Sequence, residues 1–168
     1  GDVVSKWEGP ARLVLALERT FLNLAAYSCG ISTATQKLVE QARRACPGSP
    51  PRVTATRKML PHYRDVANYA VRAGGGFSPR VNLAGGVLIK ENHIAAAGGI
   101  AHAIQGARAV APHLLKIEVE VTNIKELGLA LKAGADAVLL DNFSPNEVTA
   151  ALSAISKAKV RPVVEVSG

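Results

Sequence analysis

Cationic side chains follow two short β-type runs of this sequence. Arg57 ends the run RVTATR and Lys58 follows it directly, while Lys90 is the last residue of GVLIK. Arg80 lies between the two runs, shortly after the triple glycine at positions 74–76. In α/β proteins, ligands bind at the carboxyl ends of the parallel strands. We therefore expect these cations to converge on a pocket for an anion with several negative groups, although a lone Arg-Lys pair is more often a solvated turn.

Two carboxylates and a Ser-Gly pair lie at the ends of three later apolar runs. Glu120 is near the end of KIEVEV, Asp141 ends AVLLD, and Ser167-Gly168 ends RPVVEVSG. Glu118 shares a strand face with Glu120, but Glu120 is nearer the carboxyl end. Carboxylates suit Mg²⁺ held together with a diphosphate, and a Ser-Gly turn offers backbone N–H groups to a phosphate. The alternative for each carboxylate is an ion pair with a nearby lysine.

Helical patterns separate these runs, so strands and helices alternate along most of the chain. Strands that recur roughly every 20–30 residues with a helix between them are typical of β/α units around a parallel sheet. Two helices are expected before the first run, one reaching Gly30 and one from about Ser32 to Ala45. The sequence therefore predicts an α/β fold with about five parallel strands, at RVTATR, GVLIK, KIEVEV, AVLLD and RPVVEVSG.

Three of the intervening helices have recognisable ends. Asn123 with Glu126, and Ser144 with Glu147, are spaced like capping boxes and predict helix starts. Gly74 is expected to end the helix that follows Pro61.

Composition narrows the class of protein. Of 168 residues, 48% are apolar and only 4% aromatic, which suits a helix-covered parallel sheet. The formal charge of +7 favours anionic partners, either phosphorylated metabolites or nucleic acid. Few aromatics and dispersed basic residues favour the metabolite over a nucleic-acid-binding module. The two cysteines and the absence of an apolar run of about 18 residues predict a reduced, cytoplasmic protein without a membrane span.

The sequence has no zinc-binding or Walker-type spacing. His93, three residues after Lys90, is expected to be structural rather than catalytic, and the other histidines are expected at the surface or at helix ends.

Six segments together resemble the quinolinate phosphoribosyltransferase family. They are, in order, ERTFLNLAAYSCGISTAT, TRKMLPHYRDVANYAVRAGGG, VLIKENHIAAAGG, KIEVEV, AGADAVLLDNFSP and VEVSG. The resemblance implies an enzyme that joins quinolinate to phosphoribosyl pyrophosphate with Mg²⁺ and releases nicotinate mononucleotide, pyrophosphate and CO₂. It also implies an α/β sandwich domain followed by an incomplete α/β barrel, assembled as a homodimer or higher homo-oligomer.

The resemblance also implies roles for individual residues. The family's quinolinate- and phosphate-binding cations match Arg19, Arg57, Lys58, Arg80 and Lys90. Its acidic residues near the ribose and the metal-diphosphate match Glu120 and Asp141, and its 5′-phosphate turn begins at Ser167-Gly168. The catalytic residues expected on this basis are Lys58, Lys90, Glu120 and Asp141.

Three segments depart from the family pattern. Pro79 precedes Arg80 where the family usually has His, Ala67-Asn68 replaces Glu-Lys before Tyr69, and Met59-Leu60 replaces two threonines. A family member that acts on another pyridine carboxylate, or one that is catalytically silent, is therefore an alternative.

The resemblance also predicts a domain division. Residues 1–17 are expected to be a remnant of an amino-terminal domain or linker, and residues 18–168 a partial α/β barrel. Because family active sites use parts outside this span, we expect the 168 residues alone to bind substrates weakly and not to turn over.

Overall fold

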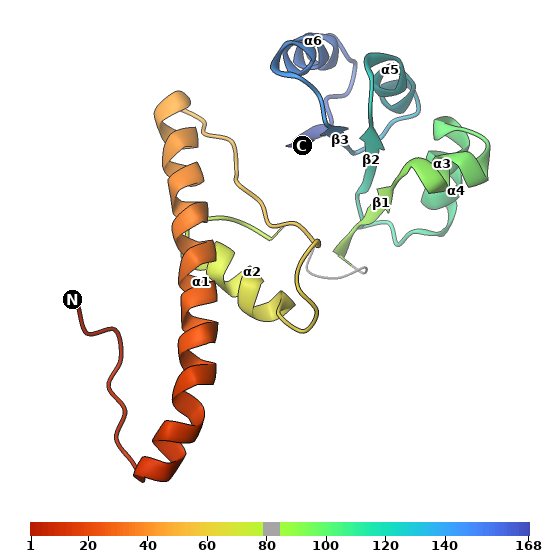
Figure 1. Ribbon diagram of the computed structural model, residues 1–168. Helices are drawn as coiled ribbons and strands as arrows, with labels where there is room; N and C mark the ends of the chain where they lie inside the picture. Colours follow the sequence, from red (N-terminus) through yellow and green to blue (C-terminus); the bar gives the residue numbers. More distant parts are fainter. Residues whose placement is uncertain (79–84) are drawn as a thin grey trace. The chain divides into compact units, whose positions relative to one another are not determined.

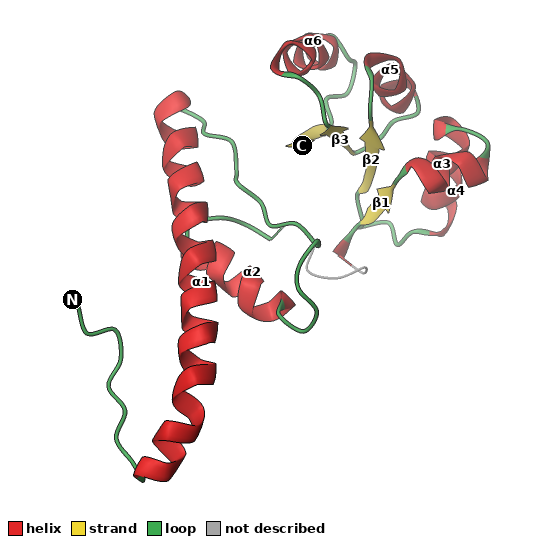
Figure 2. Ribbon diagram, in the orientation of Figure 1, coloured by secondary structure: helices red, strands yellow, loops and turns green. Residues whose placement is uncertain are grey.

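The computed structural model describes residues 1–78 and 85–168 of the chain (Figure 1). The chain divides into two compact units, Gly1–Val81 and Asn82–Gly168, and each is described by itself. The first unit is helical and the second is a parallel sheet with helices, as the colouring by secondary structure shows (Figure 2). The predicted division after residue 17 stays a prediction; helix α1 runs through that position without a break.

Helix α1 spans Ala11–Ala45 as one continuous helix of 35 residues. The prediction of two helices that meet near Gly30 is therefore wrong. A glycine in a helix interior costs only about 1 kcal/mol relative to alanine, too little to end a helix of 35 residues that packs against α2. The helix ends where expected, at Ala45, with Cys46 as its C-cap and Pro47 directly after.

Helix α2, Arg64–Ala73, packs against α1, and Gly74 is its C-cap as predicted. The glycines after it allow a very close approach to α1. A β-carbon on Gly74 would overlap the backbone oxygen of Ser32, and one on Gly76 would lie 2.8 Å from Thr35 Cγ2. The triple glycine thus has a packing role within the first unit.

The segment RVTATR does not form a strand of the sheet. The ladder contact described for it is an isolated parallel bridge from Thr54 to Phe77, with Ala55 N–H donating to Phe77 O at 2.8 Å and Phe77 N–H donating to Val53 O at 2.9 Å. The β-branched residues gave the segment the composition of a strand, but a strand also needs a run of paired backbone groups. The expectation of about five strands is corrected to four in the described part of the chain.

The second unit is a parallel sheet in the order β1-β2-β3-β4. Its strands are β1 (Val87–Ile89), β2 (Ile117–Val121), β3 (Ala137–Asp141) and β4 (Val163–Ser167). The helices between them are α3 (Glu91–Ala97), α4 (Ile100–Val110), α5 (Ile124–Lys132) and α6 (Pro145–Ser156). The α/β class and the parallel sheet are as predicted; α3 was not predicted, because it is a single short segment of seven residues.

The predicted capping residues begin two of these helices. Asn123 Oδ1 accepts a hydrogen bond from Glu126 N at 2.9 Å at the start of α5. Ser144 and Glu147 form a full capping box at the start of α6, with Pro145 as its first residue.

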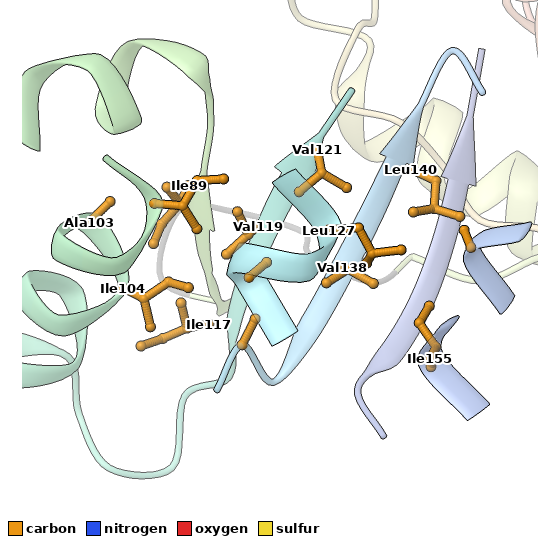
Figure 3. Close-up of a cluster of buried hydrophobic side chains, with 14 residues drawn as sticks. Ile89, Ala103, Ile104, Ile117, Val119, Val121, Leu127, Val138, Leu140 and Ile155 are labelled. Carbon is orange, nitrogen blue, oxygen red and sulfur yellow. The ribbon is translucent and has the colours of Figure 1, made fainter. Parts of the chain in front are cut away.

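The core of this unit lies between one face of the sheet and the helices (Figure 3). Alternate residues of β2 are fully buried, while Glu118 and Glu120 between them are half-buried. The buried residues shared by strands and helices include Ile89, Ile104, Ile117, Val119, Val121, Leu127, Val138, Leu140 and Ile155. The opposite face of the sheet is thereby left for polar side chains.

Within the described residues, no helix is both long enough and apolar enough to cross a membrane. Both cysteines, Cys29 and Cys46, are free thiols.

Candidate active site

The polar face of the sheet presents side chains from adjacent strands at matched heights. Glu120 of β2 pairs in register with Leu139 of β3, and Leu139 pairs with Glu165 of β4. One step further toward the carboxyl ends, Asp141 pairs with Ser167. By this strand pairing, Asp141 and Ser167 lie side by side at the carboxyl rim. Glu120 lies one pleat deeper on the same face of the sheet, and Glu118 lies one pleat deeper again.

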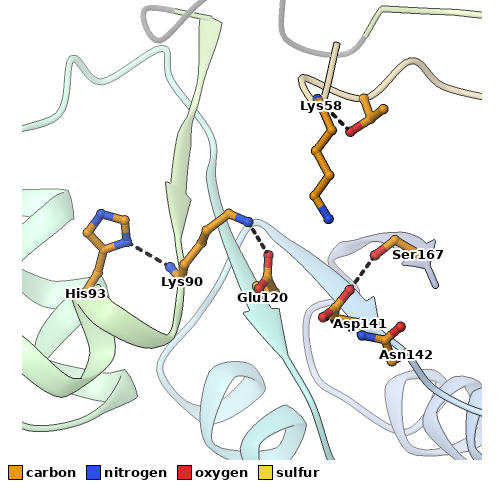
Figure 4. A network of polar contacts seen from close by, with 8 residues as sticks. Lys58, Lys90, His93, Glu120, Asp141, Asn142 and Ser167 are labelled. Atoms are coloured by element: carbon orange, nitrogen blue, oxygen red, sulfur yellow. Dashed lines mark hydrogen bonds and ion pairs between the residues drawn. The ribbon is translucent and has the colours of Figure 1, made fainter. Parts of the chain in front are cut away.

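Lys90 and Glu120 form an ion pair across the first two strands. Ile89 pairs with Val119. Lys90 and Glu120, the next residue on each strand, therefore lie opposite each other. The Lys90 Nζ lies 2.9 Å from Glu120 Oε2 (Figure 4). Lys90 is 46% exposed and Glu120 only 15%, so the lysine reaches solvent while it neutralises the more buried carboxylate.

His93 fixes the backbone from which Lys90 projects. Lys90 is the N-cap of α3, and its backbone N–H donates to His93 Nδ1 at 3.0 Å. An imidazole nitrogen that accepts leaves the proton of the neutral ring on Nε2. The expectation that His93 is structural agrees with this contact.

The Asp141 carboxylate receives one donor on each oxygen. Ser167 Oγ donates to Asp141 Oδ1 at 2.8 Å, and Asn142 Nδ2 donates to Asp141 Oδ2 at 3.0 Å (Figure 4). Gly168, the other half of the predicted phosphate turn, has a φ of +142° and approaches Asn142 closely. An open depression of about 380 Å³ adjoins this corner, lined by Asn142, Phe143, Ser144, Glu147, Val166, Ser167 and Gly168.

The remaining predicted cations belong to the first unit. Arg19 is exposed on α1, and Arg57 and Lys58 are exposed in the segment that follows the Thr54 bridge. Arg80 lies outside the described residues. Convergence of these cations with Lys90 on one pocket stays a prediction.

The carboxylates at this rim fit a Mg²⁺ ion that is shared with a ligand better than one that the protein holds alone. In residues 1–78 and 85–168, no three Asp, Glu, His or Cys side chains gather as a metal-binding group. Glu120 is engaged by Lys90, whereas each Asp141 oxygen accepts one described hydrogen bond and retains a lone pair. Mg²⁺ commonly takes one or two carboxylates together with phosphate oxygens, and Asp141 meets that requirement.

Asn142 is the residue of this corner that sequence reasoning missed. It follows Asp141 directly in the sequence, but it neither titrates nor carries charge, so its type alone does not indicate a functional residue. The signal was available in the type of residue, since asparagine after the last residue of a strand readily adopts a left-handed turn.

A parallel sheet of β/α units with a lysine, two carboxylates and a Ser-Gly turn at its carboxyl end defines an α/β domain with charged side chains where domains of this class bind ligands. Residues 31–168 match the family described as quinolinate phosphoribosyl transferase, C-terminal domain. The chain belongs to this family, and the resemblance seen in its sequence motifs is confirmed.

Curated relatives agree. The chain is 44% identical to a probable nicotinate-nucleotide pyrophosphorylase (carboxylating) from Methanocaldococcus jannaschii, over 98% of this chain and 59% of the relative. It is 41% identical to the human nicotinate-nucleotide pyrophosphorylase (carboxylating), over 98% of this chain and 55% of the relative. The chain thus spans between half and two thirds of the length of these relatives.

Solved structures show the same fold. NadC from Streptococcus pyogenes superposes with a TM-score of 0.82 at 38% identity, covering 95% of this chain and 54% of that one. The nicotinate-nucleotide pyrophosphorylase from Francisella tularensis gives a TM-score of 0.77 at 40% identity, covering 94% and 54%.

Proposed function

We propose that this chain is the barrel part of a quinolinate phosphoribosyltransferase, which forms nicotinate mononucleotide for NAD biosynthesis. The observation that supports this most is the rim on which Lys90, Glu120 and Asp141 lie at the ends of three adjacent strands, in a chain of this family. The names of its relatives, carboxylating nicotinate-nucleotide pyrophosphorylases, agree with the assignment.

The proposed reaction has two parts. The quinolinate ring nitrogen forms a bond to C1 of the ribose while the bond from C1 to the pyrophosphate oxygen breaks. The C2 carboxylate then leaves as CO₂, its bonding electron pair is stabilised by the positively charged ring, and a proton takes its place at C2. Quinolinate, phosphoribosyl pyrophosphate and one proton therefore give nicotinate mononucleotide, pyrophosphate and CO₂.

In this proposal, the cationic residues bind the anionic groups of the substrates, and the carboxylates stabilise the positive charge of the transition state. Quinolinate has two carboxylates, and we assign their binding to Arg19, Arg57, Lys58, Arg80 and Lys90, with Lys58 and Lys90 also facing the departing pyrophosphate. Glu120 and Asp141 stabilise the positive charge that develops at the ribose as its bond to the leaving group lengthens. Ser167-Gly168 offers backbone N–H groups to the 5′-phosphate.

Mg²⁺ is part of this proposal. Asp141, with Glu120 beside it, would hold the ion together with the diphosphate, and the ion would neutralise charge on the leaving pyrophosphate. We expect weak binding of Mg²⁺ to the protein alone and tight binding in the presence of phosphoribosyl pyrophosphate, and calorimetry measures both.

We also propose that the protein works as a homodimer or a larger homo-oligomer in the cytoplasm. The exposed apolar residues of α1, among them Leu13, Leu17 and Phe21, support this because large apolar side chains on a helix surface favour association. Sedimentation equilibrium of the protein at its natural length tests the oligomeric state.

The experiment that tests the function is a product assay on the purified protein at its natural length. Quinolinate, phosphoribosyl pyrophosphate and Mg²⁺ are supplied, and nicotinate mononucleotide is quantified by chromatography. Formation at about 1 s⁻¹ or faster supports the proposal. Nicotinate and other pyridine carboxylates are assayed in parallel, and preference for one of them would assign a different substrate.

A further inference from the structure

We infer that Asn142 is a positioning residue that holds the Asp141 carboxylate in its working orientation and joins the ends of β3 and β4. The inference rests on the proposed function, in which Asp141 faces the reacting ribose and the metal-diphosphate. In this proposal Asn142 acts through Asp141 and does not itself contact the substrate.

Three hydrogen bonds support this role, and all lie within the second unit. Asn142 Nδ2 donates to Asp141 Oδ2 at 3.0 Å, and Ser167 Oγ donates to Asp141 Oδ1 at 2.8 Å. The Asn142 backbone N–H donates to Ser167 O at 2.8 Å. Asn142, Asp141 and Ser167 thus form a closed set in which each residue is bonded to the other two (Figure 4).

The backbone at this point limits which residues are tolerated. Asn142 has a φ of +56°, in the left-handed region that asparagine enters more readily than most non-glycine residues. A β-carbon on Gly168 would lie 3.0 Å from both Asn142 Cα and Asn142 Oδ1. The turn therefore favours asparagine or glycine at position 142 and a glycine at 168.

The consequence for Asp141 is a fixed carboxylate plane. A terminal carboxyl group otherwise rotates over a broad range, because its last torsion has no staggered wells. One donor on each oxygen removes that freedom and leaves the other lone pairs directed at a ligand. Groups that orient a catalytic or metal-binding carboxylate in this way typically contribute about 10- to 100-fold in metal affinity or activity.

The substitution Asn142→Gly tests the inference with the least disturbance of the turn. Glycine accepts the left-handed backbone and keeps its N–H bond to Ser167, but it removes the donor to Asp141. We expect kcat to fall about 10- to 100-fold and the Mg²⁺ concentration for half-maximal rate to rise, with the KM for quinolinate unchanged. Asn142→Asp, which keeps the shape but places an acceptor beside Asp141, should lower kcat further.

His62→Gly is the matched control. His62 is the other non-glycine residue with a left-handed φ, +65°, in the described part of the chain, and it has no role in the proposed site. The same backbone change there should leave kcat unchanged. Asp141→Asn is the second control: if Asn142 acts through Asp141, adding Asn142→Gly to Asp141→Asn should have no further effect on kcat.

A crystal structure of the Asn142→Gly protein at its natural length supplies a readout that needs no activity. We expect the Asp141 carboxylate to rotate or to occupy two positions, and an Asp141 unchanged in a single position would overturn the inference. Wild-type levels of kcat in Asn142→Gly would overturn it as well. A wild-type protein that makes no nicotinate mononucleotide would instead refute the proposed function, and the crystal structure would still decide whether Asn142 orients Asp141.

Discussion

Lys90 and Glu120 meet across adjacent strands with 2.9 Å between Nζ and Oε2, and the carboxylate is the more buried partner. The pair therefore places a positive and a negative side chain next to each other at the carboxyl end of the sheet. In the proposed function Lys90 binds a dianionic substrate, and because Glu120 already holds the lysine in place, the cost of ordering its side chain on binding is lower.

We predict that Lys90→Ala lowers kcat/KM for the full reaction. The lost transition-state stabilisation should be about 2–4 kcal/mol, as for the loss of an oxyanion-binding donor. It should also destabilise the fold, because it leaves the largely buried Glu120 charge without its described partner. Steady-state kinetics and urea unfolding measure the two effects. Lys132→Ala, an exposed lysine in the last turn of α5, is the control and should change neither.

The double variant Lys90→Ala, Glu120→Ala separates the two effects of Lys90. Stability should recover toward wild type because the unpaired charge is gone, while activity stays low. A double variant less stable than Lys90→Ala alone would contradict the role given to the ion pair.

His93→Ala should lower the free energy of unfolding by about 1 kcal/mol, as the loss of a helix cap does. The variant removes the acceptor for the Lys90 backbone N–H, so amide exchange in α3 should accelerate. His93→Gln places a neutral acceptor at the same helical position, where capping boxes prefer Glu or Gln. Hydrogen exchange should return to the wild-type rate in that variant, and equal exchange in all three proteins would refute the cap.

Substitution of two glycines, Gly30 within α1 and Gly74 packed against it, should change the stability of the protein in opposite directions. Gly74→Ala should destabilise the protein by about 1–3 kcal/mol, the usual cost of overpacking, since its β-carbon would overlap the backbone oxygen of Ser32. Gly30→Ala lies in the exposed interior of α1 with nothing within 4 Å, so it should stabilise by up to about 1 kcal/mol. Thermal unfolding of the two variants decides, and a neutral Gly74→Ala would show that α1 and α2 are less closely packed than described.

The start of α6 should make stability depend on pH in the acid range. Hydrogen bonds from the Ser144 hydroxyl and then from the Ser144 backbone N–H lower the pKa of Glu147 from its ordinary value of 4.5. A lowered folded-state pKa stabilises the protein above 4.5, and this stabilisation is lost as pH falls through the folded-state value. Between pH 7 and pH 3, Glu147→Gln should therefore lose less of its melting temperature than the wild type, and parallel melting curves would contradict the assignment.

Much of the second unit could be predicted from the sequence because its signals are local. The strands at KIEVEV and AVLLD follow from short apolar runs, and the starts of α5 and α6 follow from Asn123 and Ser144, whose side chains cap the helices that come next. The placement of Glu120 and Asp141 at the rim follows from the same periodicity, since parallel strands end on one side.

Two of the three features that the sequence could not predict depend on partners far along the chain. Gly30 looked like a helix end, but α1 continues because one glycine costs little in a long helix. RVTATR has the composition of a strand, yet the only ladder partner described for it is Phe77. The contact of Asn142 with Ser167 depends on the register of β3 with β4, which no local pattern specifies.

A crystal structure of the protein at its natural length, soaked with quinolinate, pyrophosphate and Mg²⁺, tests the central claim most directly. We predict quinolinate with a carboxylate bound to Lys90 Nζ at the carboxyl ends of the strands, and Mg²⁺ between pyrophosphate and Asp141. Quinolinate bound away from that rim, or Mg²⁺ and pyrophosphate bound without Asp141, would contradict it.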